Sequence, residues 1–250
     1  MCDDLADTSF LARIGAQTHE VATPRATHAK TARKQLADLC EEAAAEGVDL
    51  AKDLASSKAL NDLFLGLCDH APYLVRLMRK DWQRVARLLH VDPATSMTRL
   101  LAQTRAAWQQ AGTTEAAMMA ALRRAKQEVA LLVALADLGG VWGVDEVTAG
   151  LSHFADAACA SALDFLLSEA IQSGRFVPVD PDHPSHGSGL VVLALGKHGA
   201  GELNYSSDID VIVLYDPEVA PLGPRAEPGS FFVRLTQALV RLMQERTGEG

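Results

Sequence analysis

Two short β-branched runs near the end of an otherwise helical sequence constrain the fold of this chain most strongly. The first run is Leu190–Leu195 and the second is Ile209–Tyr215. Each is short and mainly apolar and is followed by glycine-rich or proline-rich sequence, which is typical of strands. The first run has no polar side chain, so we expect it to be buried. Together the runs predict two neighbouring strands joined by the polar segment Gly196–Asp208.

The sequence before these runs is rich in alanine and leucine and has a helical apolar period. Pro72 and the pair Asp92-Pro93 are typical helix starts, since proline at the first helical position needs no amide hydrogen. Thr113 is predicted to cap a further helix. From Asp145 onward, apolar residues recur at steps of three and four until Gly174, which predicts a long amphipathic helix.

These patterns predict an α+β fold with three parts. Residues 1–176 form an all-helical region, and 177–189 form a linker rich in proline and glycine. Residues 190–250 hold the opening strands of a mixed sheet. A proline-rich loop is expected over 216–230, and helical spacing resumes over 231–246.

Composition narrows the possible functions and locations. Lys and Arg number 23 against 32 Asp and Glu, so the net charge is −9 and bulk nucleic-acid binding is not expected. The longest apolar stretch, Val129–Ala136, is far shorter than the roughly 20 residues of a membrane span. The acidic N-terminus lacks the features of a signal peptide. The chain has four widely spaced cysteines, which predict reduced thiols in the cytoplasm: Cys2, Cys40, Cys68 and Cys159.

The polar segment between the strands carries the candidate chemistry. The first strand ends at Gly196, where the missing side chain lets a phosphate approach the backbone, and Lys197 adds a cation. Strand side chains alternate, so Asp208 and Asp210 are expected on one face while Ile209 points into the core. Two close carboxylates repel unless a cation lies between them, and Mg²⁺ prefers such oxygen ligands. The segment therefore predicts a site for Mg²⁺ and a nucleotide phosphate.

Neighbouring residues allow more than one interpretation. Ser207 is equally suited to donating to a phosphate and to satisfying the turn, whereas Glu202 and Asn204 are expected to brace the loop. The small basic face of Arg123, Arg124 and Lys126 is expected to be solvated, with docking of an acidic partner as the alternative. A metal pair at His183 and His186 is not expected, since the loop offers them no partners.

Other phosphate-binding and hydrolytic motifs are excluded. A Walker-type loop has Ser or Thr after its lysine, where this sequence has His198. The spacing of Gly196, Gly199 and Gly201 does not match the dinucleotide-binding fingerprint. The chain contains neither an HExxH motif nor a nucleophile elbow.

The segment from Gly196 to Asp210 resembles the nucleotidyltransferase superfamily typified by DNA polymerase β. More closely, it resembles the signature of the glutamine synthetase adenylyltransferases, in which a Gly-Lys turn precedes Ser-Asp-Ile/Leu-Asp. The matching positions are Gly196, Lys197, Gly199, Gly201, Glu202, Leu203, Ser207, Asp208, Ile209 and Asp210. Ala200 stands where the family usually has glycine. Upstream, Leu122–Glu128 with Asp137-Leu138 resembles a helix of the same family.

The resemblance implies a function, a cofactor and partners. The sequence Glu202-Leu203-Asn204 is similar to the corresponding sequence in the N-terminal half of these enzymes. That half removes AMP from a tyrosine of glutamine synthetase by phosphorolysis and releases ADP. It implies that Asp208 and Asp210 are catalytic Mg²⁺ ligands and that Gly196, Lys197 and Ser207 bind nucleotide and phosphate. It also implies glutamine synthetase, AMP, ADP or ATP, and a PII signalling protein as partners.

One family feature has no counterpart in this sequence. The resemblance implies a third metal carboxylate in an Asp-x-Arg-x-Arg-Pro-like string on a later strand, and no such string occurs before Gly250. We therefore expect a fragment with an incomplete metal site that is inactive alone. The alternative hypothesis is a non-catalytic helical module that docks glutamine synthetase or a PII-type regulator.

Overall fold

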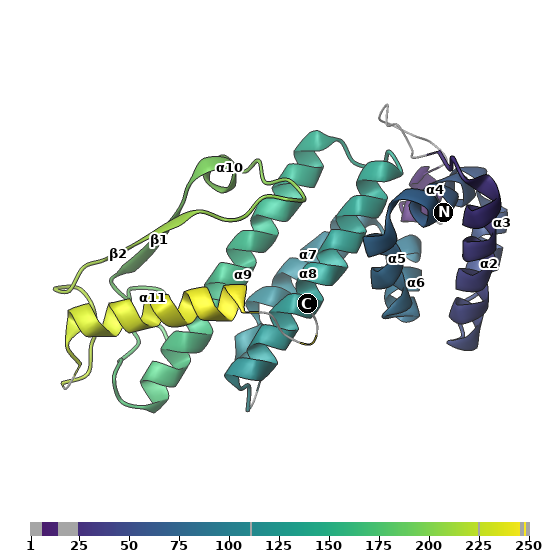
Figure 1. Cartoon of the computed structure of the whole chain (residues 1–250). Helices are drawn as coiled ribbons and strands as arrows, with labels where there is room; N and C mark the ends of the chain where they lie inside the picture. The colour runs from purple at the N-terminus through teal and green to yellow at the C-terminus, as the bar shows by residue number, and fades with distance from the viewer. Residues whose placement is uncertain (1–6, 15–24, 111, 225, 246–247, 249–250) are drawn as a thin grey trace, which may run out of the picture. The chain divides into compact units, whose positions relative to one another are not determined.

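A computed structural model describes residues 7–14, 25–110, 112–224, 226–245 and 248 (Figure 1). It shows many helices and one two-stranded antiparallel sheet, so the predicted α+β class is confirmed. Cys2 and Gly250 lie outside the described residues. Contacts divide the chain into two compact units, the first formed by 1–99 with 127–147 and the second by 100–126 with 148–250.

The first unit is entirely helical in its described part. Its core is built from large side chains such as Leu39, Phe64, Met78 and Trp82, each no more than 1% exposed. Side-chain caps begin several of its helices, since Asp49, Ser57 and Asp81 each accept a hydrogen bond from an amide in the first turn. The helices are α1 (Phe10–Ile14), α2 (Ala29–Ala45), α3 (Leu50–Ser56), α4 (Lys58–His70), α5 (Pro72–Arg79), α6 (Trp82–His90), the beginning of α7 (Pro93–Arg105) and the end of α8 (Glu115–Leu138).

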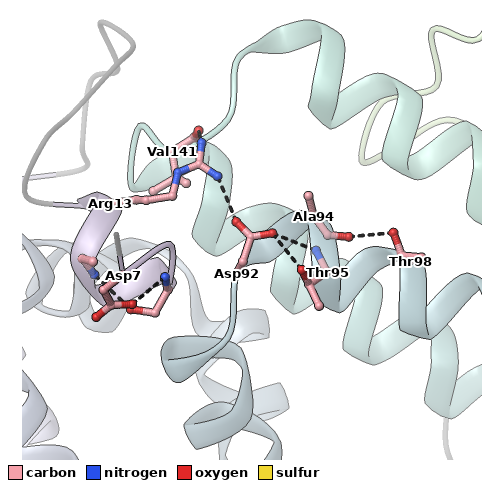
Figure 2. A network of polar contacts seen from close by, with 9 residues as sticks. Asp7, Arg13, Asp92, Ala94, Thr95, Thr98 and Val141 are labelled. Carbon is pink, nitrogen blue, oxygen red and sulfur yellow. Dashed lines mark hydrogen bonds and ion pairs between the residues drawn. The ribbon is translucent and has the colours of Figure 1, made fainter. Parts of the chain in front are cut away.

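Asp92 and Arg13 together link three segments of this unit (Figure 2). Oδ2 of Asp92 accepts from the amide of Thr95 at 2.9 Å, which caps α7 at the predicted Asp92-Pro93 start. Its Oδ1 lies 3.3 Å from Nη1 of Arg13 on α1, and Nη2 of Arg13 donates to the carbonyl of Val141 at 3.0 Å. One carboxylate thus fixes a helix start and also connects it to the N-terminal helix.

The second unit combines helices with the sheet. Its elements are the end of α7, a 3₁₀ turn (Ala107–Gln109), the beginning of α8, most of α9 (Val144–Gln172), β1 (Leu190–Ala194), α10 (Gly196–Gly199), β2 (Val211–Tyr215) and α11 (Pro228–Gln244). Its core joins α9 to α11 through side chains such as Phe165, Leu166, Phe232 and Leu239. Phe232 also stacks on Tyr215 of β2, with ring centroids 4.6 Å apart. This packing holds the hairpin against the helices.

The two strands pair from Leu190 opposite Tyr215 to Ala194 opposite Val211. Only one sheet face packs against the helical core, with Leu190 and Val192 among the residues in contact. The expectation that the first strand is buried was therefore wrong for its other face. That face exposes a row of large apolar side chains: Val191, Leu193, Leu195, Ile212 and Leu214, each 42–52% exposed. The cause is that, in the described chain, helices cover this hairpin from one side.

Helix starts at proline were predicted well, and threonine capping less well. Pro72 begins α5 as expected. The cap of α8 is Thr114 and not Thr113, because the Thr114 hydroxyl accepts from the amide of Ala117 while the Thr113 hydroxyl donates to the carbonyl of Gln110. The predicted loop over 216–230 ends early, because Glu227 caps α11 through the amides of Gly229 and Ser230.

The division of the chain differs from the boundary expected at 177–189. The helical region splits within α7, α8 and α9, and the parts of α8 and α9 that belong to the second unit share a core with Leu190 and Val192 of the sheet. In the described part of the chain, no helix has both the length and the apolar character needed to cross a bilayer.

Candidate functional site

The glycine-lysine turn follows β1 directly and depends on glycine at two positions. Gly196 has a φ of 55°, which an L side chain rarely adopts. A Cβ at Gly199 would lie 2.5 Å from the carbonyl oxygen of Ala194, so only glycine lets the chain turn this closely against the strand end. The amide of Gly199 donates to the carbonyl of Leu195 at 3.0 Å, which closes the turn. The turn α10 is thus set by backbone sterics.

The two aspartates lie just before β2 and not within it. The predicted strand start at Ile209 was two residues early, because the ladder stops at Val211 where β1 ends and the chain turns into α10. One further bond joins the amide of Leu195 to the carbonyl of Asp210 at 2.8 Å. Asp208 and Asp210 are exposed while Ile209 is half-buried, so the expected alternation is present.

The turn and the second aspartate face the same space. A Cβ built on Gly196 would lie 3.9 Å from Oδ2 of Asp210, and, apart from its chain neighbours and the backbone of its own turn, no other described atom lies within 4 Å of it. The neighbouring Lys197 is exposed, and its ammonium forms no ion pair with a described residue. An open backbone and a carboxylate therefore approach each other at one end of the hairpin, where the exposed Lys197 follows Gly196 in the chain.

Ser207 and Asn204 form the turn that precedes the aspartates. The Ser207 hydroxyl donates to Oδ1 of Asn204 at 2.7 Å and accepts from the amide of Asn204 at 3.3 Å. The same Oδ1 accepts from the amide of Ser206 at 3.2 Å. Of the two interpretations of Ser207, this geometry favours satisfaction of the turn, and Asn204 braces the loop.

Helix α9 supports the loop through residues that the sequence pattern did not single out. Nε2 of His198 lies 2.9 Å from Oδ1 of Asp156, and the amide of Leu203 donates to the hydroxyl of Ser152 at 3.2 Å. Both helix residues are polar and stand one turn apart, but nothing in their local sequence marks them as loop anchors.

The expectation of a solvated basic face was wrong for Arg123, because Arg123 donates to carbonyls at the end of α11.

Other groups that could carry chemistry are poorly placed for it. Burial raises the pKa of the Cys68 and Cys159 thiols to about 11, so these free cysteines are weak nucleophiles. His183 and His186 stack with ring centroids 4.9 Å apart. Among the described residues, no group of three or more His, Cys, Asp or Glu side chains is arranged to hold a metal ion.

The donor chemistry of the hairpin end nevertheless suits Mg²⁺. Asp208 and Asp210 present exposed carboxylate oxygens, and Mg²⁺ is commonly held by one or two carboxylates together with substrate phosphates and water. The backbone at Gly196 is open on the side of Asp210, since Asp210 is the one residue beyond its own turn that an added Cβ would meet within 4 Å in the described chain. The residues present therefore fit the ion as two of its ligands.

The fold and this polar hairpin end define an α+β protein with an acidic, glycine-lysine site. Residues 62–250 match the family model of the glutamate-ammonia ligase adenylyltransferases. The chain therefore belongs to this family.

Relatives from several bacteria agree with the family match. The chain is 47% identical over 231 residues to a bifunctional glutamine synthetase adenylyltransferase/adenylyl-removing enzyme of Bradyrhizobium sp., covering 92% of this chain and 23% of the relative. It is 44% identical over 252 residues to the enzyme of that name from Rhodopseudomonas palustris, covering 99% of this chain and 24% of the relative. The enzyme of that name from Xanthobacter autotrophicus is 43% identical, covering 94% of this chain and 22% of the relative. The chain thus spans about a quarter of the length of these relatives.

Proposed function

We propose that this chain carries a Mg²⁺-dependent nucleotidyl-transfer site that acts on an adenylylated tyrosine of glutamine synthetase. The observation that supports this most directly is the approach of the Gly196 backbone to the Asp210 carboxylate at one end of the hairpin, with the exposed Lys197 next in the chain. Family membership supports the adenylyl chemistry. The relatives named above are described as both adenylyltransferases and adenylyl-removing enzymes. The proposal assigns this chain to the removal of AMP.

The proposed reaction is phosphorolysis of the AMP–tyrosine bond. An oxygen of inorganic phosphate forms a bond to the phosphorus of AMP, and the bond from that phosphorus to the tyrosine oxygen breaks. The products are ADP and the free tyrosine, whose oxygen takes up the proton that the phosphate brings. Charge accumulates on the phosphate oxygens during such a transfer, so electrostatic stabilisation and positioning are the main requirements.

Each residue of the site has a role in this scheme. Gly196 lets a phosphate approach the backbone, and Lys197 attracts it with its exposed ammonium. Asp208 and Asp210 hold Mg²⁺, which when bound supplies positive charge to the phosphate oxygens. Ser207 keeps the turn before the aspartates in shape through Asn204. The partners in this scheme are adenylylated glutamine synthetase, phosphate and the adenine nucleotides, and a PII signalling protein is the proposed regulator. The location that fits these partners is the cytoplasm.

The proposal is tested with the full-length protein, adenylylated glutamine synthetase, Mg²⁺ and phosphate. Intact mass spectrometry reads the loss of the AMP adduct, and chromatography reads ADP formation. Asp208→Asn should slow both by about a hundredfold or more, as expected when a ligand of a catalytic metal is lost. Asp216→Asn is the control, because Asp216 is an exposed aspartate at the other end of β2. Removal of AMP by Asp208→Asn at the wild-type rate would contradict the assignment.

The alternative is a non-catalytic module that docks glutamine synthetase. It predicts that neither aspartate affects any reaction and that binding survives the double substitution Asp208→Asn/Asp210→Asn. The activity of the double variant separates the two hypotheses, because the proposed site requires activity to fall even when a titration shows that binding of glutamine synthetase persists.

A further inference from the structure

His198 is the one buried side chain in the exposed glycine-lysine turn. It is 6% exposed, while Lys197 before it and Gly199 after it are both exposed. Its Nε2 lies 2.9 Å from Oδ1 of Asp156 on α9. An ionised carboxylate can only accept, so Nε2 carries the hydrogen and donates it. The turn is therefore joined to the long helix by a hydrogen bond with a charged acceptor.

Stability alone does not explain a histidine at this position. Its Nδ1 is buried and has no hydrogen-bond partner in the described chain. Burying an unpaired polar atom is unfavourable, and an apolar side chain of similar size would fill the space without that cost. The side chain of Asp156 is 56% exposed, so solvent screens the pair and limits its contribution to folding. The pair instead fixes the orientation of the turn relative to α9.

A second contact from the same helix fixes the far end of the loop. The Ser152 hydroxyl accepts from the amide of Leu203 and donates to the carbonyl of Thr148. Ser152 and Asp156 are four residues apart, so they lie on the same side of α9. Leu203 is itself 4% exposed. The segment between His198 and Leu203 is thus attached to α9 at both ends, and Lys197 stands beside the first attachment.

We propose that His198 and Asp156 form a positioning pair that holds the Lys197 turn on α9 and thereby sets the affinity of the site for the phosphate that is its substrate. The inference rests on the proposed function and adds two positioning residues to it. His198 faces the helix and does not contact the substrate, so its effect passes through the orientation of Lys197. Fixing the turn in advance reduces the ordering cost of phosphate binding.

The test measures KM for phosphate and kcat separately in the full-length protein. His198→Leu removes the donor and keeps the apolar volume, Asp156→Ala removes the acceptor at an exposed position, and His198→Gln restores a donor. We expect the first two variants to raise KM for phosphate about tenfold, as the loss of one hydrogen bond to a charged group allows, with kcat within about twofold of wild type. The Gln variant should stay close to wild type. His153→Leu, an exposed histidine on the same helix, is the matched control.

Pairwise coupling distinguishes an interaction from two separate effects. If the two residues act through one hydrogen bond, the double variant His198→Leu/Asp156→Ala should raise KM no further than either single variant. An unchanged KM in Asp156→Ala would overturn the proposal. So would a fall in kcat alone, because that result would place the effect on the chemical step.

Hydrogen exchange keeps this test independent of the proposed reaction. The amides of Gly199, Ala200, Gly201 and Glu202 all bond within the turn or to the strand end. Loss of the anchor should increase their exchange rates about tenfold in Asp156→Ala, and not in His153→Leu. If Asp208→Asn retains full activity but exchange increases as stated, the proposed function fails and the anchor stands. Unchanged exchange in Asp156→Ala would show that the anchor itself is wrong.

Discussion

Nη2 of Arg123 on α8 lies 2.8 Å from the carbonyl oxygen of Met243, next to the end of α11. The same nitrogen donates to the carbonyls of Glu245 at 2.8 Å and Leu242 at 3.3 Å. The last carbonyls of a helix have no partners within the helix, and a cation beside them also interacts favourably with the helix dipole. One guanidinium therefore stabilises the end of the helix that packs on the hairpin.

Removing this contact should loosen α11. Arg123→Met keeps the aliphatic stem and leaves three carbonyls without their donor, so we expect the free energy of unfolding to fall by about 1–2 kcal/mol. Urea unfolding followed by circular dichroism measures the change. Arg124→Met is the control, since Arg124 is exposed on the same helix. Equal losses in the two variants would contradict the role assigned to Arg123.

The cap of α7 predicts a graded response at Asp92. Asp92→Ala loses both the cap at Thr95 and the ion pair with Arg13, and should cost about 1–2 kcal/mol. Asp92→Asn keeps an acceptor for the cap and should cost less. Thr98→Ala serves as the control because the Thr98 hydroxyl only donates back to the carbonyl of Ala94 at an exposed position. Thermal unfolding of the three variants gives the order, and an Asn variant as unstable as the Ala variant would contradict it.

Stability should depend on pH through Asp69. The amide of His28 foremost, together with the amide and hydroxyl of Thr27, holds the pKa of the Asp69 carboxyl well below its ordinary value of 3.8. The folded chain binds this proton less readily than the unfolded chain, so the carboxylate contributes its stability above the unfolded-state pKa. That contribution is lost as pH falls below about 4 towards the lower folded-state pKa.

Asp69→Asn separates this effect from general acid unfolding. At pH 7 the wild type should be more stable than the Asn variant, and the difference should shrink as the pH is lowered to about 3. Urea midpoints of both proteins at several pH values measure it. A difference in unfolding free energy that stays constant with pH would show that the carboxylate charge is not responsible.

Glycine substitutions in the loop should differ in severity for steric reasons. At Gly199 a new Cβ would lie 2.5 Å from the Ala194 carbonyl, so Gly199→Ala must displace the turn from the strand end. At Gly201 the new Cβ would meet open space, and only the φ of 73° causes strain, which costs about 1–2 kcal/mol. We expect Gly199→Ala to be the less stable of the two in thermal unfolding. The reverse order would contradict the close approach.

Local signals in the sequence predicted a large part of this fold. Proline at helix starts, the apolar period of α9 and the two β-branched runs all act through short-range physics, and the structure has each element near its expected place. The segment of the candidate site was identified in the same way, because the glycines and the alternating aspartates lie within one short stretch. The exact start of β2 depended instead on where its partner strand ends.

Long-range contacts could not be predicted in this way. His198 and Asp156 are 42 positions apart, and Arg123 and Met243 are 120 apart. No period or motif links such residues, since their meeting depends on how α9 and α11 pack. For the same reason, the division of α7, α8 and α9 between two units was not apparent from the helical pattern. The exposed sheet face also contradicted the expectation that the first strand is buried, which rested on a run that is apolar throughout.

The binding of a divalent cation by the paired aspartates tests the central claim most directly. Mn²⁺ in place of Mg²⁺ gives an electron paramagnetic resonance signal that falls when the ion is bound, and ADP without protein provides the baseline. With the full-length protein and ADP, the wild type should reduce the free Mn²⁺ signal well below that baseline. Asp208→Asn/Asp210→Asn should weaken this binding by about tenfold or more, and Asp216→Asn should not. Wild-type binding by the double variant would contradict the site proposed here.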